Sequence, residues 1–278
     1  MLPTLNIIGA GQVGRSLGRL FYLHGVFKIG HVVSRTQSNV DAAVRFIGQG
    51  TPTTAISDLK PTAVTLICVP DDEIIKTAEA LYRTHTVQRG SLIFHCSGSK
   101  PSSDLKSVPN FPNELGLVLA SVHPVRSFAN PEEVSQDFRG TNCCIEGDEG
   151  AQSILVPAFE KLGANIVHIQ SERKLLYHAG SVFASNFLVT LLDTAMQAYT
   201  AAGIAPEVAI ELAKGLSQKT LQNVFQLGAA SALTGPIKRG DFDTVLRQND
   251  VVEEWDEMRG KLYSAFIDPT AQLAGRQK

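Results

Sequence analysis

The feature that most constrains this chain is the run Gly9-Ala10-Gly11-Gln12-Val13-Gly14, which directly follows the apolar residues 5–8. Apolar residues recur at helical spacing over residues 17–21, so the motif lies between a strand and a helix. In that context a Gly-x-Gly-x-x-Gly motif is typical of dinucleotide binding: Gly9 makes a tight turn, Gly11 lets the backbone approach a pyrophosphate, and Gly14 lets the helix pack closely. Without that context, such turns also occur for steric reasons alone. The residues predicted to hold the cofactor here are Gly9, Gly11, Gln12, Val13 and Gly14.

A second predicted strand begins at Lys28 and ends in Ser34, Arg35 and Thr36. Position 35 lies 21 residues beyond Gly14, where an NAD-binding chain would place an acid for the ribose 2′-hydroxyl. A guanidinium and two hydroxyls suit a 2′-phosphate instead, so these three residues predict NADP rather than NAD. The alternative is that Arg35 is an ordinary exposed arginine in a loop.

Composition narrows the class of protein and of partner. The chain has 278 residues, of which 44% are hydrophobic, and a formal net charge of -2. Such a charge gives no broad attraction to nucleic acid or to an anionic membrane, so a small-molecule partner is expected.

The four cysteines lack metal-ligand spacing, which predicts no metal site and a reduced, cytoplasmic protein. A strand that begins within five residues of Met1, without a basic region before it, argues against a signal peptide.

Further apolar runs at residues 63–69, 91–95 and 117–122 alternate with helical patterns. This alternation predicts an α/β fold with a doubly wound, mostly parallel sheet, in which ligands bind outside the carboxyl ends of the strands. Polar or turn-forming residues follow each run. The site residues that we expect at this edge of the sheet are Val69, Pro70, Ser97 and His123.

The pattern changes after residue 169, because strand-like runs stop and long helical patterns take over. We therefore expect a nucleotide-binding domain over residues 1–169 and an all-helical domain over residues 170–278. Residues 172–202 read as one long helix, capped by Ser171 and ended by Gly203. The helix is apolar nearly all round, which predicts burial in protein, including burial by a second subunit; its polar residues argue against a membrane span.

Four polar residues of this helix, Lys174, His178, Ser181 and Ser185, fall within a band roughly 60° wide at 100° per residue. These polar residues could form hydrogen bonds inside the protein or in a dimer interface. Alternatively, they could form a surface that faces the nicotinamide. Asn186 flanks these residues and could reach the same site.

Residues 232–241 interrupt the helical pattern with glycines, a proline and two cations, before a final helix expected near residues 251–266. The loop is either a rigid connector or part of a site in which Lys238 or Arg239 accepts an anion. Arg126 or Arg239 could clamp a substrate carboxylate through two hydrogen bonds.

The chain resembles a two-domain family of uncharacterised NADP oxidoreductases, in which a Rossmann-like domain is followed by a domain of unknown function. The motifs that carry the resemblance are Gly9–Gly14, Val69-Pro70-Asp71, His95-Cys96-Ser97-Gly98, His123-Pro124 with Ser127-Phe128, Tyr177-His178-Ala179 with Ser185-Asn186, and residues 233–241. The family is similar in architecture to 6-phosphogluconate dehydrogenase, β-hydroxyacid dehydrogenases and pyrroline-5-carboxylate reductase. The resemblance implies an N-terminal Rossmann domain, a helical C-terminal domain of the 6-phosphogluconate dehydrogenase type, and a homodimer.

In β-hydroxyacid dehydrogenases the long helix carries a lysine that acts as general acid/base and an asparagine four residues later. Here Lys174 is followed at that spacing by His178, and the residue four before Asn186 is Val182. The pair is not matched.

Two functions are consistent with these features. The first is an NADP-dependent oxidoreductase that moves a hydride to or from a small carbonyl or hydroxy, or imine or amino, compound. An unperturbed histidine titrates near pH 6.5, so His178 is the first candidate proton donor, followed by Lys174 and His123, while Ser97 would orient the substrate oxygen. The second is a non-catalytic sensor or partner protein that binds NADP(H) without turnover.

Overall fold

The computed structural model describes residues 1–84, 86–109 and 111–276, and packing divides the chain into two compact units, Met1–Ser181 and Val182–Lys278. The boundary expected after residue 169 precedes this division. The start of the long helical segment packs with the sheet. This is shown by Lys174, whose side chain is fully buried and donates to Glu146.

The first unit is built on an eight-stranded sheet within the part of the chain that the structure describes, and its strand order is β3-β2-β1-β4-β5-β6-β7-β8. The strands are β1 (Thr4–Ile8), β2 (Lys28–Val33), β3 (Thr51–Thr53), β4 (Thr62–Ile67), β5 (Val87–His95), β6 (Val118–Pro124), β7 (Asn142–Gly147) and β8 (Asn165–His168). Neighbouring strands are parallel except for the antiparallel pair β6 and β7. This order, with its reversal between β1 and β4, confirms the predicted doubly wound Rossmann fold.

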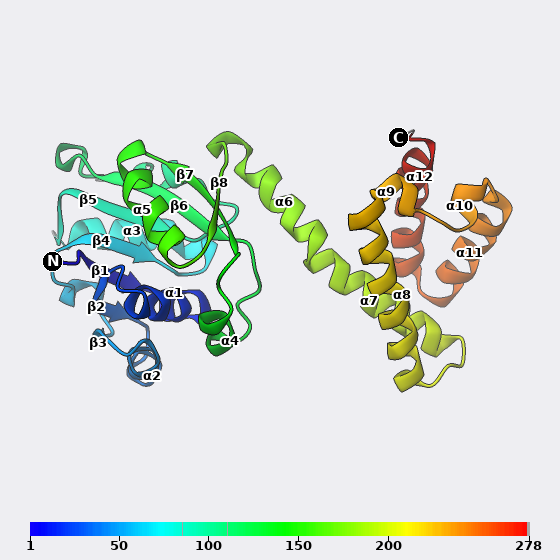
Figure 1. Ribbon diagram of the computed structural model, residues 1–278, viewed down its shortest axis with the longest axis horizontal. Coiled ribbons are helices and arrows are strands. Elements are labelled where there is room, and N and C mark those ends of the chain that lie inside the picture. Colours follow the sequence, from blue (N-terminus) through cyan, green and yellow to red (C-terminus); the bar gives the residue numbers. More distant parts are fainter. Residues whose placement is uncertain (85, 110, 277–278) are drawn as a thin grey trace. The chain divides into compact units, whose positions relative to one another are not determined.

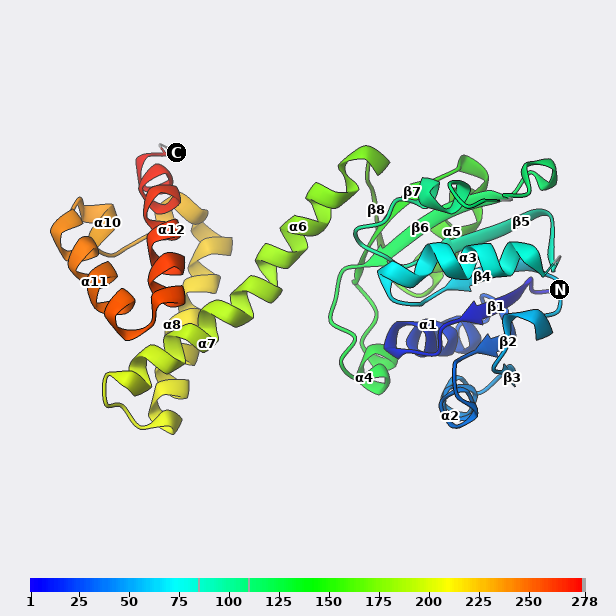
Figure 2. The ribbon, with the colours of Figure 1, turned by 180° about the vertical axis from the view of Figure 1, so that it is seen from behind.

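Helices cover both faces of the sheet (Figures 1 and 2). One core joins the sheet to α1 (Gln12–Leu23), α2 (Gln37–Ile47), α4 (Pro131–Gln136) and α5 (Glu149–Lys161). The other core joins the opposite face to α3 (Ile74–Arg83) and to the 3₁₀ helix η3 (Ser102–Lys106). The remaining 3₁₀ turns are η1 (Ile56–Asp58), η2 (Asp71–Glu73), η4 (Asn113–Leu115) and η5 (Ser171–Arg173). Burial of both faces explains why the central strands read as continuous apolar runs.

The second unit is helical, as predicted. Its helices are α7 (Asn186–Ala201), α8 (Pro206–Leu227), α9 (Ala229–Ala232), α10 (Pro236–Arg239), α11 (Phe242–Trp255) and α12 (Glu257–Gly275). Helix α6 (Lys174–Ala184) begins in the first unit and ends just past the division. Within the second unit α7 packs on α8, and α11 packs on α12.

Two helix predictions need correction. The single helix expected over residues 172–202 is divided into α6 and α7 at Ser185, whose backbone is non-helical (φ -126°, ψ -72°). The last helix is likewise two helices, because the extended residue Asp256 ends α11 and caps α12 by accepting the Arg259 amide.

The expectation that the long segment is buried does not hold within a single chain. Leu175 is 70% exposed and Phe183 is 67% exposed. Residues Ser171–Ala201 contain one segment that is long and apolar enough to cross a membrane, with a mean hydropathy of 1.4 and none of it buried within the chain.

Candidate functional site

The glycine-rich turn connects β1 to α1 and has the shape that its sequence predicts. Gly9 has a positive φ of 107°, and its amide donates to the Val33 carbonyl over 2.9 Å. A Cβ at Gly9 would lie 2.2 Å from the Cys68 carbonyl oxygen, and a Cβ at Gly14 would lie 2.1 Å from the Gly9 carbonyl oxygen. Only glycine fits at these two positions.

The surroundings of Gly11 fit the phosphates of a dinucleotide. Apart from Gly11 and its two chain neighbours, no atom of the described residues lies within 4 Å of a Cβ built at Gly11, so the space beside its backbone is open. Helix α1 begins directly afterwards at Gln12, so the N-terminal N–H groups of α1 border that space. The turn can therefore hold a diphosphate with backbone groups.

The predicted 2′-phosphate residues lie at the end of β2 and the start of α2. The Ser34 hydroxyl accepts from Asn39 Nδ2 over 2.6 Å, and Asn39 Oδ1 accepts from Arg15 Nη2 over 2.9 Å. Arg35 and Thr36 are exposed. Arg15 and Asn39 were not predicted, because their contact joins α1 to α2 across 24 residues.

Val69 and Pro70 follow β4 and border the glycine-rich turn, since a Cβ at Gly9 would lie 3.1 Å from the Val69 nitrogen. Asp71 comes next, and its Oδ2 accepts from the Ser99 hydroxyl over 2.6 Å. The turn that follows β5 is therefore tied to the residues that follow β4, which places Val69, Pro70 and Ser97 along one edge of the sheet.

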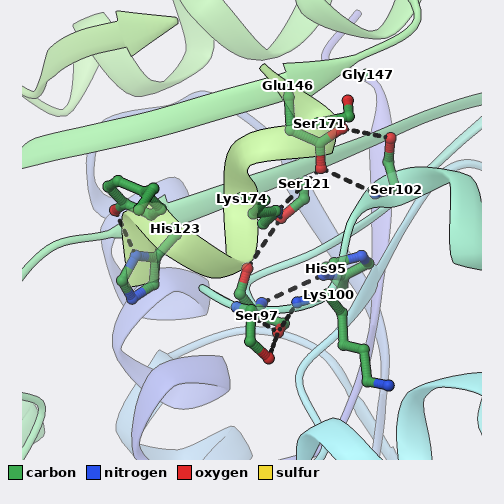
Figure 3. A network of polar contacts seen from close by, with 12 residues as sticks. His95, Ser97, Lys100, Ser102, Ser121, His123, Glu146, Gly147, Ser171 and Lys174 are labelled. Atoms are coloured by element: carbon green, nitrogen blue, oxygen red, sulfur yellow. Dashed lines mark hydrogen bonds and ion pairs between the residues drawn. The ribbon is translucent and has the colours of Figure 1, made fainter. Parts of the chain in front are cut away.

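Ser97 organises the turn in which it lies (Figure 3). Its Oγ accepts from the backbone amides of Ser99 over 3.1 Å and Lys100 over 2.9 Å. Its own amide donates to Nδ1 of the buried His95 over 3.2 Å. These contacts fix the backbone of residues 97–100 at the carboxyl end of β5.

His123, Tyr177 and His178 form a cluster beside this turn, at the carboxyl end of β6 and on α6. His123 Nδ1 and the Tyr177 hydroxyl lie 2.7 Å apart, and the His123 and His178 ring centroids are 5.5 Å apart, edge to face. A Cβ at Gly98 would lie 2.3 Å from His178 Nδ1 and 2.9 Å from His123 Cε1. Gly98 therefore lies directly against both imidazoles, and the structure brings together His123, His178 and the Ser97 turn.

The protonation states of this cluster follow from its burial. Burial, followed by the charges of His178 and Lys174, lowers the pKa of His123 to about 4. Burial, followed by a contact with Cys144, raises the pKa of the Tyr177 hydroxyl. We therefore assign a neutral His123 whose Nδ1 accepts from Tyr177 and whose proton lies on Nε2.

Lys174 belongs to a buried polar network next to this cluster (Figure 3). Its side chain is fully buried, and its Nζ donates to the Ser121 hydroxyl and, over 2.9 Å, to Glu146 Oε1. Burial would raise the pKa of Glu146, but Lys174 and the hydroxyls of Ser171 and Ser102 outweigh it and lower that pKa. Burial lowers the pKa of Lys174 even against the opposing effect of Glu146.

Glu146 and Ser121 were not predicted as functional residues. The available signal was a carboxylate inside an apolar strand, which requires a charged partner when it is buried.

Two further predicted residues, Asn186 and Arg126, lie elsewhere in the chain. Asn186 begins α7 in the second unit. Arg126 is partly buried, and its Nη1 donates to the Asp137 carbonyl and, over 3.3 Å, to Thr141 Oγ1. Residues 1–84, 86–109 and 111–276 contain no cluster of metal-ligating side chains.

Comparison with known proteins finds two domain models that match successive parts of the chain. A Rossmann-like domain matches residues 3–124, and a domain of unknown function (DUF2520) matches residues 141–268. The chain therefore carries a Rossmann-like domain followed by DUF2520, the two parts, in the order, of the family that the sequence motifs resemble. Among curated proteins, none matches this sequence.

Several solved structures share the fold over nearly the whole chain. A "putative NADP oxidoreductase" from Bacteroides fragilis is 20% identical, with a TM-score of 0.76 and coverage of 98% of both chains. A protein from Thermotoga maritima is 27% identical, with a TM-score of 0.71 and coverage of 97% of this chain and 98% of its own. An imine reductase from Myxococcus stipitatus, in complex with NADP⁺, is 18% identical, with a TM-score of 0.66 and coverage of 97% and 93%.

Proposed function

We propose that this protein is an NADP-dependent oxidoreductase that moves a hydride to or from a small carbonyl or hydroxy, or imine or amino, compound. The observation that carries the proposal is the position of the His123, Tyr177 and His178 cluster. It lies at the carboxyl ends of β5 and β6, on the same edge of the sheet as the glycine-rich turn after β1. A nucleotide held by that turn and a polar cluster along that edge is the arrangement that doubly wound enzymes use.

The residues that would hold the cofactor fit a phosphorylated dinucleotide. The open space beside Gly11 and the start of α1 suit the diphosphate, and Ser34, Arg35 and Thr36 suit a 2′-phosphate. The Myxococcus stipitatus imine reductase, whose structure contains NADP⁺, and the Bacteroides fragilis protein share this fold. NADP(H), when bound, supplies or accepts the hydride.

The chain's own residues would donate or accept the proton and would orient the substrate. A neutral His123 presents an N–H at Nε2 that can donate to a substrate oxygen or nitrogen. His178 gives or takes the proton, since its ring packs edge to face against His123 and lies against Gly98. The fixed Ser97 turn shapes the adjoining surface.

The assembly that we propose is a cytoplasmic homodimer in which the helical region is covered by a second copy. Large apolar side chains are exposed along α6, α7 and α8, and Phe225 is 84% exposed. Exposed apolar surface of this kind marks an interface. A second copy is favoured over a membrane or nucleic acid because Lys174, at the start of α6, is buried in the sheet domain and the net charge is -2. Light scattering is expected to give twice the chain mass; a monomer would contradict this assembly.

The function is tested by following NADPH oxidation in the presence of a panel of small keto acids, aldehydes and cyclic imines. At least one compound is expected to be reduced, and His178→Ala is expected to lower kcat by about a hundredfold, as for the loss of a general acid. His168→Ala, which changes an exposed histidine on β8, is the matched control. NADPH binding without turnover across the panel would instead favour a non-catalytic sensor, and a loss below tenfold in His178→Ala would remove His178 from this role.

A further inference from the structure

The lysine at the start of α6 makes all of its observed polar contacts inside the fold. Lys174 is fully buried and donates from Nζ to the Ser121 hydroxyl and to Glu146 Oε1. Ser121 in turn donates from Oγ to the Ser97 carbonyl oxygen over 3.1 Å. A continuous chain of polar contacts therefore runs from Lys174 to the backbone that directly precedes Gly98.

The carboxylate of Glu146 joins two segments that are distant in sequence. It accepts from the amide and the hydroxyl of Ser102, each over 2.8 Å, and from the Ser171 hydroxyl over 2.7 Å. Ser102 begins η3, just after the Ser97 turn, and Ser171 begins η5, which leads into α6. Glu146 and Lys174 therefore hold the Ser97 turn and the start of α6 in one arrangement.

His178 lies one helical turn after Lys174 and depends on this arrangement. Its Nδ1 would lie 2.3 Å from a Cβ at Gly98, so the imidazole rests on the backbone of the Ser97 turn. Within the described parts of the chain, His178 Nδ1 is buried and has no hydrogen-bond partner. Close packing, rather than a hydrogen bond at Nδ1, therefore places this ring.

We propose that Lys174 is a positioning residue. Together with Glu146 it holds the Ser97 turn against the first turn of α6 and thereby sets the placement of His178, while Lys174 itself exchanges no proton with the substrate. The value of this placement for catalysis rests on the proposed function. The positioning itself does not, and it is measured without cofactor or substrate.

The decisive experiment is amide hydrogen exchange of the cofactor-free protein in Lys174→Met and in Glu146→Gln. The amides of Ser99, Lys100 and Ser102 are expected to exchange at least roughly tenfold faster in both variants, because the contacts that hold residues 97–102 are weakened. Amides of α1 and α2, on the other face of the sheet, are expected to keep their wild-type rates. Lys106→Met is the matched control, since Lys106 lies in η3 and forms a partly exposed ion pair with Asp148.

A second readout separates positioning of the site from general stabilisation. In Lys174→Met the ring resonances of His178 are expected to shift, while those of His31 and His168 stay at their wild-type positions. Wild-type exchange at residues 97–102 together with an unchanged His178 ring would overturn the proposal. Faster exchange of every segment in both variants would also overturn it, because the pair would then only stabilise the fold. Failure of NADPH to bind would leave these measurements unaffected.

Discussion

The Tyr177 hydroxyl lies 2.7 Å from His123 Nδ1 and joins the first turns of α6 to the carboxyl end of β6. The contact orients the His123 ring and places its remaining proton on Nε2. An orienting partner of this kind gives a neutral imidazole a defined direction in which to donate.

Tyr177→Phe tests the importance of that orientation. Loss of the hydroxyl is expected to lower kcat by about ten- to a hundredfold, at or below the lower end of the roughly 10²–10⁴-fold contributed by a group that transfers the proton itself, with NADPH affinity unchanged. Steady-state kinetics on the substrate found in the panel, with calorimetry for NADPH, checks both parts. Tyr22→Phe, which alters an exposed tyrosine of α1, is the control. Unchanged kcat in Tyr177→Phe would show that the contact is dispensable.

Gly98→Ala tests the close packing of the Ser97 turn on the histidine cluster. The added methyl would lie 2.3 Å from His178 Nδ1, so the ring or the turn must move. We expect a loss of at least about tenfold in kcat/KM, because small misplacements of reacting groups are costly. Gly180→Ala is a matched control on α6, where no described atom beyond its chain neighbours and the nearby helix backbone lies within 4 Å of the new methyl. Equal kinetics for the two variants would contradict the assigned site.

Arg35→Ala tests the preference for NADP. A charge-assisted hydrogen bond to a 2′-phosphate contributes about 1.5–3 kcal/mol, so NADPH affinity is expected to fall by roughly ten- to a hundredfold. NADH affinity is expected to stay within about twofold, because NADH lacks that phosphate. Calorimetric titration of both coenzymes measures the difference, with Arg45→Ala on α2 as the control. Equal effects on NADPH and NADH would assign Arg35 to another role.

The free energy of unfolding is expected to fall as the solution is acidified from about pH 6.5 to about pH 4. Burial, with Lys174, lowers the pKa of His95 to about 4, and His123 is lowered to the same value. The unfolded chain, whose histidines titrate near 6.5, therefore binds more protons in this window. Each histidine contributes a slope of up to about 1.4 kcal/mol per pH unit, and its contribution levels off below pH 4. Urea unfolding across this range measures the slope.

His123→Asn is expected to reduce that slope, because one of the two groups no longer titrates. His168→Asn, on the exposed surface of β8, is expected to leave the slope unchanged. An identical slope in wild type and His123→Asn would show that His123 is not held neutral in the folded protein.

The sequence predicts those parts of the fold that depend on short-range patterns. Gly9 and Gly14 are required by steric contacts at a strand-to-helix turn, which the spacing alone indicates. The apolar runs at β4 and β5 indicate a sheet covered on both faces. The polar clusters that follow the strands indicated the edge where His123 and Ser97 lie.

The remainder depends on contacts between distant segments. Glu146 and Lys174 are 28 residues apart, and Tyr177 and His123 are 54 residues apart, so no local pattern pairs them. The spacing of Lys174 and His178 on one helix indicated a shared face, yet packing places Lys174 in a buried ion pair and His178 beside Gly98. The break at Ser185 was hidden because the residues before Ser185 and after Asn186 are apolar and continue the helical pattern.

The central claim is that the glycine-rich turn holds an NADP-type dinucleotide. Isothermal titration of the wild-type protein with NADPH tests it most directly. The account predicts a saturable heat with one site per chain, a weaker response to NADH, and loss of NADPH binding in Gly11→Val, which fills the space beside the turn. Absence of heat with both coenzymes, under conditions in which the protein is folded, would contradict the account.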